Sequence, residues 1–350
     1  MHGRLKRIGC LVECCLVVAG FQPGYAAASQ TCAPMQVTER GGTSAVRSET
    51  ALLPRITIEK SGRHCLESDV RQESLMDSIR RKAVRAQDEA MIRVRASDAT
   101  LDMAGHTVSN EMGPGMTIIW FSRFSPEAAT PVRPRNVRVT NGGLVSPGPM
   151  GVGVDLLAPK TYGKRSLDLA PVPEGANIAD AFEETRHMID TMSIVAGKRG
   201  IQMDGRNNVI RNSRVIVDGT TAIVAQGPGT LIENNIIEVH GDLGFMSKVD
   251  RDIESTTPYP IRLIQAEGAI IRNNEIRFVG ADKSARLTAA IGLVDSNGVL
   301  VEDNRFRGFE ELVRSDARSS HREVDNRKDL CSPALLEPPV NAQSCAKAIR

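Results

Sequence analysis

The sequence "NNVIRNSRVIV", residues 207–217, contains the pattern that best indicates the fold of this chain. Nearly the same phrase returns as "GTLIENNIIEV" at 229–239, as "GAIIRNNEIRF" at 268–278 and as "NGVLVEDNRFRG" at 297–308. Each copy contains two apolar residues, then a charged residue, then Asn or Asp. We align the copies on this last residue, the anchor: Asn212, Asn234, Asn273 and Asp303.

Apolar residues keep fixed places around the anchors, at two positions before and three positions after. Charged residues between them give the alternation of a strand with one buried face. The anchors lie 22, 39 and 30 residues apart, so a constant core is joined by variable spacers. Each copy therefore predicts one turn of a coil, made of two short strands with a bend. A single turn cannot bury its own apolar face, so the turns must stack, as in a parallel β-helix.

The anchors are predicted to turn the bend and to point inward. Stacked turns would place them ~4.8 Å apart, so that their amides could bond along the column as a ladder. We therefore assign a structural role to this column: Asn212, Asn234, Asn273 and Asp303.

Together with the earlier phrases "LDMAGHT" at 101–107 and "NVRVTNGGLV" at 136–145, the repeats resemble bacterial right-handed parallel β-helix proteins of the pectin-lyase-like superfamily. The resemblance covers roughly residues 54–310. It implies an all-β, right-handed solenoid. The architecture carries lyases, hydrolases, epimerases and adhesins, so it does not imply one reaction. The catalytic signatures of pectate lyases, polygalacturonases and alginate epimerases are missing from this chain.

Three regions are expected along the chain. Residues 1–28 have a basic start, a short apolar run and a small-residue end, which predicts a signal peptide and export to the periplasm or the exterior. Residues 29–314 would form the β-helix domain, and residues 315–350 a polar, non-repeating cap or tail. No membrane span is expected after cleavage, because the apolar run is too short.

Cysteines near the two ends of the mature chain are candidates for disulfides. The four that remain after cleavage are even in number, and an oxidising compartment favours their pairing. The alternatives are inert thiols, and the connectivity stays open. The candidates are Cys32, Cys65, Cys331 and Cys345.

Two excursions interrupt the coil. Residues 71–90 are charged and lack Gly and Pro, which predicts a short helix that could cap the first turns. Within the excursion at 158–198, apolar residues from Ile178 to Met192 form a helical stripe. Apolar residues at coil positions expected to face outward, such as Ile201 and Ile223, would receive this helix.

Catalytic or metal-binding residues are most expected in the long loop that follows Val239. His240, Asp242, Lys248 and Arg251 are the candidate catalytic residues. The run "DRDIE" places Asp250, Asp252 and Glu254 as candidate Ca²⁺ ligands, although it lacks the spacing of a dedicated calcium loop. The alternative is a solvated, charged excursion. We therefore expect either no cofactor or Ca²⁺.

The expected partner is a polysaccharide or another component of the cell envelope. Cleavage of the signal removes three basic residues and one acidic residue, which takes the formal charge from +2 to zero. A neutral chain has no electrostatic footprint for nucleic acid, so none is expected. Aromatic residues are only 3% of the chain, and no close carboxylate pair is evident. The sequence therefore favours a non-catalytic polysaccharide-binding or surface-structural protein. The alternative is a lyase or glycoside hydrolase acting on an acidic or cell-wall polysaccharide.

Overall fold

The computed structural model describes residues 32–36, 56–71, 90–110, 116–119, 133–148, 151–157, 182–242, 258–280 and 287–329. Within these ranges the chain forms parallel strands in two long sheets and contains no helix. The predicted parallel β-helix is confirmed. The predicted signal peptide, the helix within 71–90, Cys331 and Cys345 lie outside the described residues.

The first sheet is built from strands of similar length that pair in chain order. Its nine strands are β2 (Ile56–Ile58), β5 (Ala90–Val94), β8 (Met116–Ile119), β10 (Val152–Leu156), β12 (Arg199–Asp204), β15 (Ile223–Gln226), β18 (Ile261–Ile264), β21 (Ala289–Val294) and β24 (Glu311–Ser315).

The second sheet contains 17 strands and is bent along its length. Most turns contribute one strand on each side of the bend, whereas β9 and β11 run through it. The strands are β1 (Ala33–Pro34), β3 (Gly62–Cys65), β4 (Val70–Arg71), β6 (Ala99–Asp102), β7 (Thr107–Ser109), β9 (Arg138–Ser146), β11 (Met188–Ala196), β13 (Val209–Arg211), β14 (Arg214–Val217), β16 (Leu231–Glu233), β17 (Ile236–Val239), β19 (Ile270–Arg272), β20 (Glu275–Phe278), β22 (Val299–Glu302), β23 (Arg305–Arg307), β25 (His321–Val324) and β26 (Arg327–Lys328).

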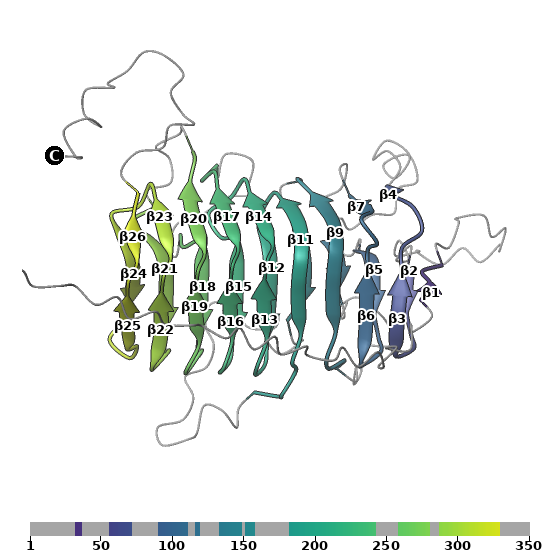
Figure 1. Ribbon diagram of the computed structural model, residues 1–350, viewed down its shortest axis with the longest axis horizontal. Coiled ribbons are helices and arrows are strands. Elements are labelled where there is room, and N and C mark those ends of the chain that lie inside the picture. The colour runs from purple at the N-terminus through teal and green to yellow at the C-terminus, as the bar shows by residue number, and fades with distance from the viewer. Residues whose placement is uncertain are drawn as a thin grey trace, which may run out of the picture. The chain divides into compact units, whose positions relative to one another are not determined.

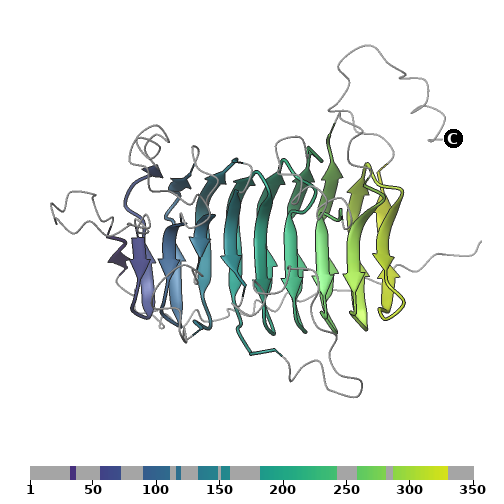
Figure 2. The same cartoon turned by 180° about the vertical axis from the view of Figure 1, so that it is seen from behind.

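A typical turn of the coil therefore has three strands, for example β15, β16 and β17, rather than the two expected from the repeat. Each strand pairs with the equivalent strand of the next turn, as β16 does with β19 and β17 with β20. Figures 1 and 2 show the turns following one another in chain order along the coil. This order places each repeated position in a row that runs along the coil.

The interior is filled by the apolar positions of the repeat. Ile210, Ile232 and Ile271 stack in one column before the bend and are all fully buried. In the nine-stranded sheet, Ile201 and Ile223 also belong to the core. The expectation that they face outward and receive a helix is therefore wrong.

The last two residues of the expected helical stripe, Ile189 and Met192, lie in a strand and not in a helix, because Met188–Ala196 forms β11. Thr191, in the middle of β11, has a left-handed φ of 56°. This bend breaks the strict alternation of the strand, so that Ile189 and Met192 both point inward and are buried. Two buried apolar residues that lie three positions apart in a bent strand have the same spacing as two residues on one face of a helix. Residues 158–181 lie outside the described part.

The coil extends beyond residue 314, where a non-repeating cap was expected to begin. β25 pairs with β22 and β26 pairs with β23, so a further turn is completed at Lys328. At the other end, Cys32 and Cys65 form a disulfide with a Cα–Cα distance of 5.7 Å. Both cysteines were disulfide candidates whose connectivity was open, and their pairing ties β1 to the first turn.

Candidate functional site

The bend of the 17-stranded sheet is made by the anchor residues. Their φ angles are 50° at Asn212, 56° at Asn234, 54° at Asn273 and 53° at Asp303. Asn and Asp adopt this left-handed conformation more readily than other residues with a side chain. All four residues are exposed. The prediction that they form an inward ladder is therefore wrong, although they do turn the bend.

The ladder lies one residue later. Asn235 Nδ2 donates to Asn274 Oδ1, and Asn274 Nδ2 donates to Asn304 Oδ1, both at 3.0 Å. Asn304 Nδ2 continues the column to Asn326 Oδ1 at 3.1 Å. The backbone N–H of each donor residue also bonds to the same oxygen of the next turn. Buried amides thus satisfy one another along the coil, while the preceding residues are left on the surface.

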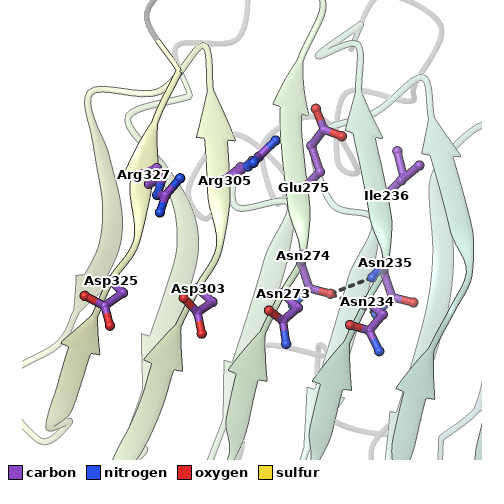
Figure 3. A pocket seen from close by; sticks show the side chains of 10 residues that line it. All are labelled: Asn234, Asn235, Ile236, Asn273, Asn274, Glu275, Asp303, Arg305, Asp325 and Arg327. Carbon is purple, nitrogen blue, oxygen red and sulfur yellow. Dashed lines mark hydrogen bonds between the residues drawn. The ribbon is translucent and has the colours of Figure 1, made fainter. Parts of the chain in front are cut away.

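An open groove of about 490 Å³ lies on the outside of this bend. Figure 3 shows its lining in two rows that run along the coil. The first row contains the bend residues Asn234, Asn273, Asp303 and Asp325. The second row lies in the strands just beyond the bend and contains Ile236, Glu275, Arg305 and Arg327. The ladder residues Asn235 and Asn274 form the remainder of the lining.

Most charged side chains on the neighbouring strands are neutralised by ion pairs. Arg211 Nη2 lies 2.8 Å from Asp190 Oδ2, and Arg272 Nη2 lies 2.7 Å from Glu233 Oε2. Within the groove, Glu275 is held by Arg277 at 2.6 Å.

The other four charged residues of the groove differ. In the described part of the chain, their side chains take part in no ion pair or hydrogen bond. They are Asp303, Arg305, Asp325 and Arg327.

A second polar cluster lies on the outer face of the nine-stranded sheet. Asp155 points outward because its neighbours Val154 and Leu156 belong to the core. It is nevertheless only 2% exposed, and its partner in the adjacent strand, Gln202, is also buried. Arg199 Nη1 donates to Gln202 Oε1 at 3.1 Å. An outer face that is polar and buried is unusual, since burial of such groups costs free energy.

Burial raises the pKa of Asp155 to about 7, in spite of a hydrogen bond from the backbone N–H of Leu157 and the nearby charge of Arg199. The Oδ2 atom of Asp155 has no hydrogen-bond partner within the described residues. A second carboxylate, Asp204, lies at the end of β12, the strand of the next turn that pairs with β10, and forms a buried ion pair with Arg133. The sequence gives no sign of Asp155, because no copy of the repeat includes it.

The loop candidates are only partly described. His240 lies at the end of β17, where Nδ1 is 3.2 Å from Asp218 Oδ1 and Nε2 is 3.2 Å from Glu238 Oε1. Burial raises the pKa of Asp218, partly offset by His240. The backbone N–H of Asp242 donates to the carbonyl of Asp218 at 2.7 Å. This group is partly exposed, and none of its residues lines the groove.

The remaining loop candidates, Lys248, Asp250, Arg251, Asp252 and Glu254, lie outside the described residues. Among the residues that are described, no group of three or more His, Cys, Asp or Glu could hold a metal ion. In that same part of the chain, no helix is long and apolar enough to cross a membrane.

Two residues of the groove, Asp325 and Arg327, were missed because they lie in the expected tail. The sequence does carry a sign of them: "DNR" occurs at 303–305 and again at 325–327. The flanking apolar residues that identify the other copies are absent, since β25 and β26 hold mostly charged residues.

Comparisons of the chain with protein-family models, with curated proteins and with solved structures find no match. The groove and the buried cluster are therefore the features of the molecule that indicate a function.

Proposed function

We propose that this protein is an exported polysaccharide-binding protein of the right-handed, pectin-lyase-like type, and that the groove at the bend is its binding site. The observation that supports this most is the regular lining of the groove along the coil axis. Successive turns offer new polar side chains every ~4.8 Å, a spacing that suits a linear polymer. Amides, carboxylates and guanidinium groups can together donate and accept hydrogen bonds with sugar hydroxyls.

Two further observations support export and a cell-envelope partner. The Cys32–Cys65 disulfide suits an oxidising compartment such as the periplasm or the exterior. Ile236, 39% exposed in the groove, offers an apolar contact for the face of a sugar ring. We propose a structural or binding role at the cell surface, with Ca²⁺ as the one cofactor to be tested.

The test compares two exposed apolar residues, Ile236 in β17 and Val279 directly after the neighbouring strand β20. Ile236→Arg places a bulky charged chain in the groove, whereas Val279→Arg changes a similarly exposed residue that does not line it. Binding to a panel of polysaccharides is measured by affinity electrophoresis, with and without Ca²⁺. We expect Ile236→Arg to weaken binding at least about tenfold, the effect of losing roughly 1.4 kcal/mol. Equal behaviour of the two variants, or no retardation by any polymer, would show that the groove is not a polysaccharide site.

The buried cluster supports a second candidate function, acid–base catalysis on a polysaccharide by a lyase or hydrolase. A carboxyl group with a pKa of about 7 can both accept and donate a proton at neutral pH. Asp155 would be the acid–base residue, with Arg199 and Gln202 beside it to stabilise developing negative charge.

This second candidate predicts that the wild-type protein releases reducing ends or unsaturated products from a polymer. Asp155→Asn should then lower the rate at least about 100-fold. Folding is checked by melting at pH 5, where the buried carboxyl is protonated and Asn is a close substitute. If a reaction is found and Asp155→Asn leaves its rate unchanged, Asp155 is not the catalytic group.

A further inference from the structure

The four unpaired charges of the groove are arranged so that like charges lie next to each other. Asp303 and Asp325 occupy the same bend position on consecutive turns, and the backbone N–H of Asp303 bonds to the carbonyl of Val324 at 3.0 Å. Arg305 and Arg327 are direct partners in β23 and β26. Consecutive turns are ~4.8 Å apart, a distance at which like charges repel.

A neighbouring row on the same sheet shows the opposite arrangement. Arg211, Glu233, Arg272 and Glu302 are partners in consecutive strands, so their charges alternate in sign. Arg272 accordingly reaches both Glu233, at 2.7 Å, and Glu302, at 3.9 Å. This row neutralises itself, whereas the charges in the groove do not.

We propose that this end of the groove recognises a zwitterionic polymer, one that carries both ammonium and carboxylate groups along its chain. The proposal rests on the polysaccharide-binding function proposed above and specifies its ligand class. The ammonium groups lie over the row of Asp303 and Asp325. The carboxylates lie over the row of Arg305 and Arg327, whose guanidinium groups can bind a carboxylate through two parallel hydrogen bonds.

Polymers of a single charge sign fit the site less well. A polyanion is attracted by the two Arg residues but repelled by the two Asp carboxylates in the adjacent row. A polycation is attracted by the two Asp residues but repelled by the two Arg residues. Electrostatic complementarity to two parallel rows of opposite sign requires both signs on the ligand. The neutral side chains at the other end of the groove, Asn234 and Asn273, accommodate hydroxyl or amide groups of the same polymer.

Four oligosaccharide probes of equal length test the proposal. N-deacetylated hyaluronan carries ammonium and carboxylate groups, and hyaluronan carries only the carboxylates. Chitosan carries only ammonium groups, and chitin oligomers are neutral. We expect N-deacetylated hyaluronan to bind at least about tenfold tighter than each of the others, as measured by titration calorimetry at low salt.

Two double variants test whether the Asp row binds the ammonium groups and the Arg row binds the carboxylates. Asp303→Asn with Asp325→Asn should lower the affinity for N-deacetylated hyaluronan to that for hyaluronan. Arg305→Gln with Arg327→Gln should lower it to that for chitosan. Arg322→Gln, an exposed Arg of β25 that does not line the groove, should leave the affinities unchanged. All of these residues are at the surface, so the variants should fold.

The outcomes separate this proposal from the one on which it rests. Suppose that hyaluronan, chitosan or chitin binds as tightly as the zwitterionic probe, and that Ile236→Arg weakens that binding. The groove then binds glycans, but the proposed preference for a zwitterionic polymer is wrong. If none of the probes binds and the wider panel also fails, both proposals are wrong. The protein alone could also form a salt-sensitive dimer that is lost in either double variant. That result would overturn the proposed preference for a zwitterionic polymer, because a second copy of the chain would then cover the four charges.

Discussion

At the scale of single residues, the repeated Asn-Asn pair divides two tasks between two neighbours. The first residue adopts the left-handed φ that turns the strand, and its side chain is exposed. The second points into the coil and continues the amide ladder. The sequence pattern revealed that a polar pair marks the bend. It could not reveal which member points inward, because the left-handed residue shifts the alternation by one position.

The ladder predicts that substitutions at the two members of the pair Asn273–Asn274 change the stability of the protein by unequal amounts. Asn274→Ala removes the Oδ1 that accepts from the backbone and side chain of Asn235, as well as two bonds donated by Nδ2. The buried N–H groups of Asn235 then lose a partner. We expect a loss of about 2–3 kcal/mol in the free energy of unfolding.

The matched control is Asn273→Asp, since Asp303 already occupies the equivalent position in the next turn. It should change stability by less than about 0.5 kcal/mol. Unfolding in urea, followed by circular dichroism, measures both variants. Similar midpoints for the two would refute the assignment of the ladder to the second residue.

At the scale of the strands, the sequence identified the second and third strands of each turn better than the first. Ala225 in β15 pairs with Leu263 in β18. Ala225 lies nine residues before the anchor Asn234, whereas Leu263 lies ten residues before Asn273. Alignment on the anchors therefore moves the first strand by one residue and exchanges its inner and outer faces. This shift is why Ile201 and Ile223 were expected to face outward. Asp155 lies before the four aligned copies, so no repeat marked the polar, buried outer face around it.

The entry to β11 carries a buried histidine that predicts sensitivity to acid. His187 is fully buried, and its Nδ1 accepts the backbone N–H of Val137 at 3.2 Å. Burial, together with the charge of Arg133, lowers the pKa of His187 to about 3. The unfolded chain takes up a proton below the usual histidine pKa of about 6.5, and the folded protein does not until about pH 3. This residue therefore makes stability fall as the pH falls from about 6.5 towards 3.

We expect the His187 contribution to fall by about 2–3 kcal/mol between pH 6.5 and pH 4.5. Asp155 acts in the opposite direction in this range, because its raised pKa keeps a proton on the folded protein that the unfolded chain releases. The comparison of wild type with His187→Gln isolates the histidine. The variant should lose less stability than wild type over this pH range, and an equal loss would contradict the buried, neutral state of His187.

At the scale of the whole molecule, several agreeing copies of one pattern sufficed to predict the stacked coil. The disulfide at its first turn was also predictable, as one of several possible pairings. The final turn was not, because β25 and β26 have few apolar residues to mark them. That turn supplies Asp325 and Arg327, so the charged end of the groove became evident only when the turns were stacked.

Carbodiimide labelling of carboxylates, read by mass spectrometry with and without a bound polysaccharide, would locate the binding site on the coil. Asp303 and Asp325 line the groove, and Glu267 is an exposed carboxylate outside it. If the groove is the binding site, the polymer should protect Asp303 and Asp325 and leave the labelling of Glu267 unchanged. Equal labelling of all three in the presence of a polymer that binds the protein would contradict the account and move the site elsewhere on the coil.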